Sequence, residues 1–83
     1  MDYFEADGHL FEFGALSEST GDDIVLECYD LHATEGGLVG IIRVGPDRRG
    51  RITLAGPVPV VVMRRWLELA QHDVDVIAIV DQL

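Results

Sequence analysis

The chain has 83 residues, of which 48% are hydrophobic and 25% charged, and its formal net charge at pH 7 is −9. This length fits a single domain over residues 1–83, and the composition is that of a folded rather than a disordered chain. The negative charge argues against direct binding to nucleic acid or to an anionic membrane surface, because both would repel it.

Positive charge is confined to one stretch of the sequence. The six cationic residues are all arginines, and they lie between Arg43 and Arg65. Ten carboxylates precede this stretch: Asp2, Glu5, Asp7, Glu12, Glu18, Asp22, Asp23, Glu27, Asp30 and Glu35. Such a separation predicts either internal pairing between the two groups or a charged surface that faces a partner.

The N-terminal half predicts two strands. Residues 9–16 place Phe11, Phe13 and Ala15 on one face by the period of two. Tyr3 and Phe4 are candidates for a further short piece of strand before the turn pair Asp7–Gly8. After a polar loop, residues 24–32 predict the second strand.

Two more strands are predicted over residues 38–44 and 51–55. A loop with Pro46, Asp47 and Gly50 joins them as a hairpin, because Pro and Asp start turns and Gly ends them. The first of these two strands is apolar on both faces.

The best helix signal runs from about residue 59 to residue 71. Pro59 suits a first helical position, where its missing N–H has no partner. The run 60–62 is β-branched and favours either strand or an irregular entry to the helix. The apolar stripe has steps of three and four, and its members are Val62, Met63, Trp66, Leu69 and Ala70. Residues 74–80 then predict a final strand that is apolar on both faces after its start.

The predicted order is β-β-β-β-α-β. It indicates an α+β fold, a mainly antiparallel sheet of about five strands with one helix packed on one face and anchored by Trp66. One helix covers one face, yet the strands at 38–44 and 74–80 are apolar on both. We therefore expect the sheet to curl on itself, or another subunit to cover the second face.

Signatures of catalysis or of cofactor binding are absent from the sequence. Cys28, Asp30 and His32 alternate on one strand face and are metal-capable, but such neighbours lie about 6.5–7 Å apart. A metal or thiol site at Cys28 is therefore the weakest alternative, and we predict no metal, no cofactor and no enzymatic activity. Because Cys28 is the only cysteine, no intramolecular disulfide can form, and we expect a cytoplasmic protein.

Two functional hypotheses remain. The first is a small acidic protein-binding domain, such as an inhibitor, immunity protein or antitoxin, which captures a basic protein partner electrostatically. The alternative is a self-associating structural or regulatory accessory domain without catalytic activity. It would be a homodimer in which the arginines of one subunit meet the acidic half of the next. The candidate partner-binding residues are Glu12, Glu18, Asp22, Asp23, Glu27, Asp30, Arg48 and Arg49.

Overall fold

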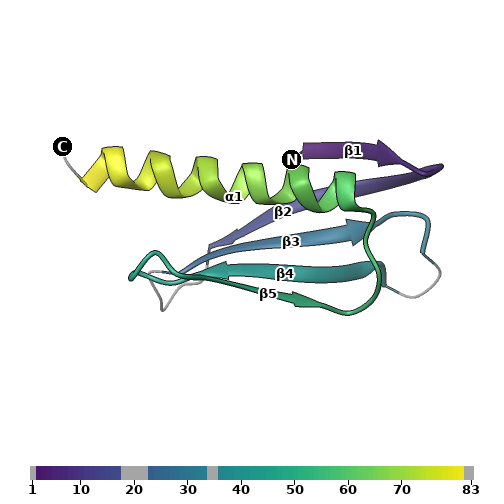
Figure 1. The fold of residues 1–83 in the computed structure, drawn as a ribbon, viewed down its shortest axis with the longest axis horizontal. Coiled ribbons are helices and arrows are strands. Elements are labelled where there is room, and N and C mark those ends of the chain that lie inside the picture. Colours follow the sequence, from purple (N-terminus) through teal and green to yellow (C-terminus); the bar gives the residue numbers. More distant parts are fainter. Residues whose placement is uncertain (1, 18–22, 34–35, 82–83) are drawn as a thin grey trace.

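The computed structural model describes the backbone of residues 2–17, 23–33 and 36–81, and the side chains of these residues except 15–17 and 76–81. The elements in chain order are β1 (Asp2–Ala6), β2 (His9–Ser17), β3 (Ile24–Asp30), β4 (Leu38–Val44), β5 (Gly50–Leu54) and α1 (Val60–Asp81). The strands form one antiparallel sheet in the order β1-β2-β3-β4-β5, with α1 packed against it (Figure 1). The predicted α+β class is confirmed.

The predicted order of elements is wrong at its end. Residues 74–80 continue α1 instead of forming a final strand, and the short N-terminal strand adds a fifth strand before the helix, so the order is β-β-β-β-β-α. Between residues 71 and 75 the sequence has neither Gly nor Pro, so nothing in it reverses the chain as a returning strand would require. The Gln71 side-chain amide donates a hydrogen bond to Asp75 at 3.0 Å, one helical turn on. Adding residues to a helix that has already formed is favourable, and this gain is larger than the weak preference of Val and Ile for strand.

The short N-terminal strand is confirmed as β1, and its turn follows from two residues. Asp7 and Gly8 have φ values of 52° and 76°, and Ala6 pairs with His9 across them. Positive φ at both central positions is the requirement of the tight hairpin turn that suits twisted strands, and Asp-Gly is one of its preferred sequences. The β1–β2 hairpin is therefore encoded locally.

Other boundaries differ slightly from the prediction. Strand β3 ends at Asp30, and Leu31 and His32 form a turn. The residues 60–62 are the first turn of α1, where the Pro59 carbonyl accepts hydrogen bonds from the N–H groups of Val62 and Met63, both at 3.0 Å. β-branched residues are thus tolerated at this helix start.

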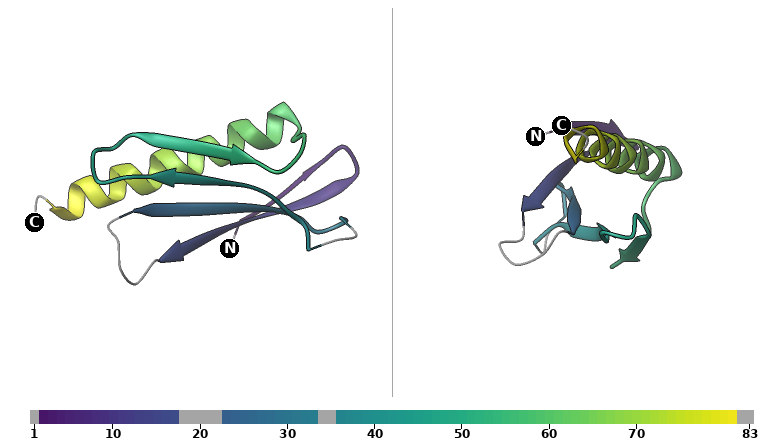
Figure 2. Two further views of the ribbon diagram at one scale, coloured as in Figure 1. Left: turned by 90° about the horizontal axis from the view of Figure 1, so that it is seen from below. Right: turned by 90° about the vertical axis from the view of Figure 1, so that its left-hand side faces the viewer.

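The core lies between the concave face of the sheet and α1. Figure 2 shows that the sheet curves from β1 round to β5 and that α1 lies within the curve. The register places alternate residues of each strand on this inner face. The buried cluster consists of Phe11, Phe13, Leu26, Cys28, Ile42, Val44, Val62, Trp66 and Ala70. The predicted role of Trp66 as the anchor of the helix is confirmed, since its side chain is fully buried.

The helix covers the inner face unevenly. It lies closest to β1 and β3, while every residue of β5 is exposed. The expected curling of the sheet is thus present, but it leaves the β5 side of the core open. Among the described residues, no helix has both the length and the apolar character needed to cross a membrane.

Candidate functional site

The outer, convex face of the sheet carries carboxylates and tyrosines on β1, β2 and β3. The register places Tyr3 opposite Glu12, and Glu12 opposite Tyr29. Glu27 lies two register pairs further along, opposite Gly14, and therefore on the same face. No described helix or strand covers these residues (Figure 2). We call this surface the acidic face and define it by Tyr3, Glu5, Glu12, Glu27 and Tyr29.

Glu27 is the chemically unusual residue of the acidic face. Among the described residues it is the only charged one that is buried, with 9% of its surface exposed. The Tyr29 hydroxyl donates a hydrogen bond to the Glu27 carboxylate. That bond, partial desolvation and the negative charges of Glu27 and Glu12 raise the pKa of the Tyr29 phenol. The carboxylate is therefore held in position by a neutral donor.

The carboxylates of the acidic face form no ion pair with a described residue; by the register, Arg43, which pairs with Asp23, lies on the same sheet face diagonally from Glu27. Gly14, opposite Glu27, leaves open space where a side chain would stand. A buried carboxylate without a cation is electrostatically costly, and a guanidinium group is the partner best shaped to compensate it. The face is thus suited to an arginine of another molecule.

Two other predicted carboxylates, Asp23 and Asp30, are already engaged within the chain. The Arg43 guanidinium donates to Asp23 at 3.1 Å. Asp30 lies on the inner face of the sheet, where His9 Nδ1 approaches its carboxylate to 2.8 Å and the His32 N–H donates to it at 2.9 Å. The structure therefore does not bring Asp30 together with Glu12 and Glu27.

The Asp30–His9 pair borders a shallow hollow of about 440 Å³ at one end of the molecule. Asp7 and Phe11 line the same hollow, as does the segment Pro57–Pro59, which leads from β5 to α1. His9 and His32 lie with ring centroids 5.5 Å apart. Among the described residues no group of three metal-capable side chains is placed to hold an ion.

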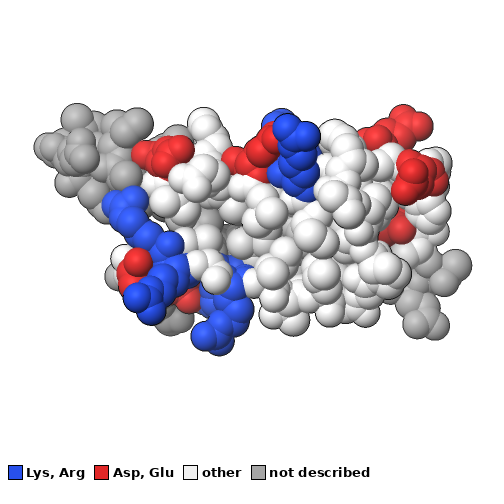
Figure 3. All heavy atoms as spheres, in the orientation of Figure 1, with Lys and Arg blue, Asp and Glu red and all other residues white. Residues whose placement is uncertain are grey.

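The remaining predicted residues lie at the opposite end or outside the described chain. Arg48 and Arg49 occupy the exposed β4–β5 loop, where Arg48 has a φ of 64°. Figure 3 shows basic side chains gathered at this end of the molecule. Neither arginine forms an ion pair with a described residue. Glu18 and Asp22 lie outside the described residues.

Cys28, the centre of the weakest alternative, is fully buried in the core. Burial, together with the nearby charge of Asp30, raises the pKa of the thiol to about 11. At neutral pH the thiol is protonated, and thiolate is the form that binds metals and acts as a nucleophile. Cys28 thus behaves as a small apolar core residue.

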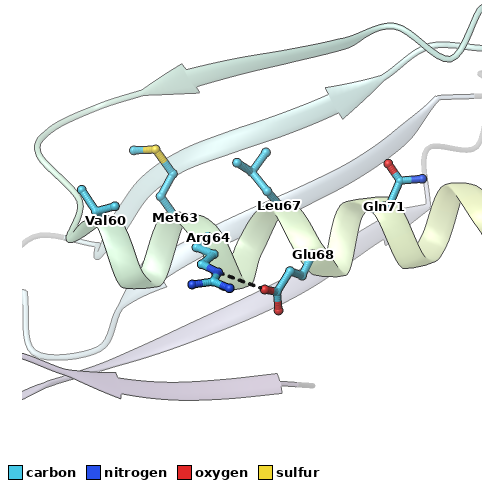
Figure 4. Close-up of a pocket in the computed structure, with 6 residues that line it drawn as sticks. All are labelled: Val60, Met63, Arg64, Leu67, Glu68 and Gln71. Atoms are coloured by element: carbon cyan, nitrogen blue, oxygen red, sulfur yellow. Dashed lines mark ion pairs between the residues drawn. The ribbon is translucent and has the colours of Figure 1, made fainter.

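A second exposed feature, which the sequence did not indicate, lies beside β5. Val60, Met63, Leu67 and Gln71 follow one another along one side of α1 and border an open groove of about 470 Å³ (Figure 4). Arg64 and Glu68 form its rim and pair at 3.4 Å. Leu67 is 49% exposed and Val60 is 80% exposed. Of the apolar stripe predicted from the sequence, only Met63 lines this groove, and Val60, Leu67 and Gln71 lie outside the stripe.

Comparison with protein-family models, with curated proteins and with solved structures gives no significant match.

Proposed function

We propose that this chain is a protein-binding domain without catalytic activity, whose acidic face captures a basic protein partner as an inhibitor, an immunity protein or an antitoxin does. The observation that carries the proposal is the Glu27 carboxylate. It belongs to a residue that is only 9% exposed, on a face that no described helix or strand covers; it is oriented by the Tyr29 hydroxyl, and it has no ion-pair partner among the described residues. A site of this kind gains from receiving a positive charge.

The chemistry of recognition follows from the residues around Glu27. An arginine from the partner would place its guanidinium between Glu12 and Glu27, where two carboxylates can accept its donors. Tyr29 and the 56%-exposed Tyr3 offer ring surfaces against which the same guanidinium can stack. Tyrosine is also among the residues enriched at protein interfaces.

Encounter with the partner would be accelerated by charge. The chain carries a net charge of −9, and a strongly negative surface raises the rate at which a basic protein finds it. Screening by salt would lower this rate, because the Debye length is about 10 Å at 0.1 M salt and about 3 Å at 1 M. The association rate should therefore fall as ionic strength rises. We propose a cytoplasmic location because the single cysteine, Cys28, allows no intramolecular disulfide.

The proposal is tested by neutralising the two central carboxylates. A partner is first isolated by affinity capture at low salt and purified, and its binding to Glu12→Gln and Glu27→Gln variants is then measured by calorimetry. We expect each variant to bind about ten- to a hundredfold more weakly, because a charge-assisted hydrogen bond contributes roughly 1.5–3 kcal/mol. Glu68→Gln on α1 removes the same charge away from the acidic face and serves as the matched control.

Two results would contradict the proposal. One is equal weakening by Glu68→Gln and by Glu27→Gln, which would indicate an effect of net charge alone. The other is an association rate that is the same at low and high salt. A simple arginine-rich peptide gives an independent check, because its NMR titration should shift the amide signals of Glu12, Glu27 and Tyr29 before those of α1.

A further inference from the structure

Strand β5 presents an open hydrogen-bonding edge. The Ala55 N–H donates to the Val39 carbonyl of β4 at 2.8 Å. Because bonding alternates along an antiparallel pair, Arg51 and Thr53 direct their backbone groups to β4. Gly50, Ile52 and Leu54 therefore direct theirs away from the sheet. All five residues of β5 are exposed.

This edge has little of the usual protection against strand pairing. Natural edges are blunted by charged residues, proline, bulges or a covering element. The other edge strand, β1, carries Asp2 and Glu5 and lies near α1. Strand β5 has Arg51 as its only charged residue and contains no proline. The one register shift of the sheet lies between β3 and β4, not at β5.

Apolar side chains continue from this edge onto α1. Ile52 and Leu54 lie on the inner face of β5, opposite Ile42 and Gly40, and are 43% and 42% exposed. The groove along α1 adds Val60 and Leu67. We call these exposed side chains, Ile52, Leu54, Val60 and Leu67, the apolar strip. The open edge of β5 and the apolar strip thus lie on the same side of the molecule.

Charge has opposite signs at the two ends of β5. Arg48, Arg49 and Arg51 lie at or just before its start, and Asp7 and Asp30 border the hollow beside Pro57–Pro59 beyond its end. Figure 3 shows the basic cluster at the lower left of this view and carboxylates at the right end; between them the lower surface is uncharged, and a mixed group of acidic and basic side chains lies above it. The charges at the two ends of β5 are therefore complementary to those of a second copy of the chain in the opposite orientation.

We propose that a second copy of this chain pairs antiparallel along β5, about a twofold axis at Ile52, so that two sheets join into one. This register brings Gly50 opposite Leu54 of the second copy and Ile52 opposite its own equivalent, which uses the outward backbone groups of both strands. The arginine-bearing loop of each copy then lies beside the Asp7 and Asp30 end of the other. The acidic face on β1, β2 and β3 stays free, so this inference does not rest on the proposed function.

The register predicts opposite effects for neighbouring substitutions. Ile52→Glu places two carboxylates face to face at the axis, and we expect the dissociation constant to rise at least about tenfold. Thr53→Glu places a carboxylate opposite Arg51 of the second copy, and dimerisation should become tighter. Sedimentation equilibrium from low micromolar to near-millimolar concentration measures both, and circular dichroism confirms that each variant is folded.

A cross-link tests the register directly. Cα atoms in a bonded pair lie about 5.5 Å apart, within the usual range for disulfides. Ile52→Cys should therefore form an intermolecular disulfide on mild oxidation, while Thr53→Cys, whose equivalent lies diagonally about 7–8 Å away, should form little. The native Cys28 is buried and its thiol pKa is about 11, so it does not compete.

Charge complementarity is tested by the variant Arg49→Glu. Arg65→Glu is the matched control, because it changes the net charge by the same amount and Arg65 does not line the groove. Only the first should weaken dimerisation, and the difference should shrink in high salt. A monomer throughout the concentration range would overturn the proposal and leave the edge to a partner of another sequence. A dimer that is unaffected by Ile52→Glu, or that cross-links equally through Thr53→Cys, would overturn the β5 register.

Discussion

At the scale of single residues, two glycines of the sheet, Gly40 and Gly14, have opposite surroundings. A Cβ on Gly40 would stand 2.7 Å from the Thr53 carbonyl oxygen and 2.8 Å from the Trp66 ring. Gly40 therefore lets the fully buried Trp66 lie directly on β4. A Cβ on Gly14 would meet nothing within 4 Å. The absence of a side chain is a packing requirement at one position and leaves open surface at the other.

We expect Gly40→Ala to lower the free energy of unfolding by about 1–3 kcal/mol, as overpacked core positions do. The clash involves backbone as well as a ring, so it cannot be relieved by moving one flexible side chain. Gly14→Ala is the control and should stabilise the strand slightly, by up to about 1 kcal/mol. Urea unfolding of both variants measures the difference, and equal effects would show that the Trp66 contact does not limit this position.

Cys28 gives the stability of the protein a pH dependence. The folded pKa of about 11 lies above the ordinary value of 9.0, so the folded state holds the thiol proton more tightly than the unfolded state does. The resulting contribution is complete below pH 9.0 and is lost as the pH rises towards 11. The raised pKa of Tyr29 acts in the same direction.

We therefore expect the free energy of unfolding to fall between pH 9.0 and 11, and Cys28→Ala to reduce the slope of that fall. The variant leaves a small cavity and should be less stable at every pH, so the slope is the informative quantity. Denaturant unfolding across this pH range measures it. An unchanged slope in the variant would show that the thiol is not protected by folding.

At the scale of elements, α1 shows how continuation outweighs local preference. Val62, Trp66 and Ala70 repeat at steps of four and are buried, and Val74, the next step, is half-buried against the same core. The composition of residues 74–80 alone favours a strand, since Val and Ile prefer strands. The packing stripe shows that the helical period persists beyond Asp73.

Asp75→Pro tests this assignment. In a helix interior, proline removes a backbone hydrogen bond and clashes with the preceding turn, so unfolding should become easier by about 3 kcal/mol. Asp75→Ala loses the same contact with Gln71 but keeps the backbone bond, and its effect should be much smaller. Thermal unfolding compares the two, and NMR Cα shifts of residues 74–80 report the helix directly. A proline variant as stable as the alanine variant would contradict the helical assignment.

At the scale of the whole molecule, charge and apolar surface are arranged on different faces. The acidic face lies on the convex side of β1, β2 and β3, and the arginines cluster near the β4–β5 loop (Figure 3). Among the described residues, internal pairing joins Arg43 with Asp23, and Arg64 and Arg65 with Glu68. On these strands the outer face of the sheet carries carboxylates and tyrosines, whereas the expected second apolar face concerned residues 38–44 and 74–80, of which 74–80 belong to α1. The exposed apolar strip lies instead between β5 and α1.

The sequence by itself determined the strands before residue 55, the β1–β2 hairpin and the helical anchor. These features follow from local signals: the alternation in residues 9–16, the Asp7–Gly8 pair, and the position of Trp66 in an apolar stripe. Local steric preferences and the burial of apolar side chains are enough to translate such signals into structure. The candidate residues Glu12 and Glu27 could likewise be named from composition and charge.

Only the tertiary structure decided which of these residues act together. It placed Glu12, Glu27 and Tyr29 on one face of the sheet, turned Asp30 towards His9, and extended α1 over residues 74–80. It also left β5 as an open edge. The physical reason is that strand register, sheet curvature and the position of the helix depend on packing between segments far apart in the chain, and no local pattern contains that information.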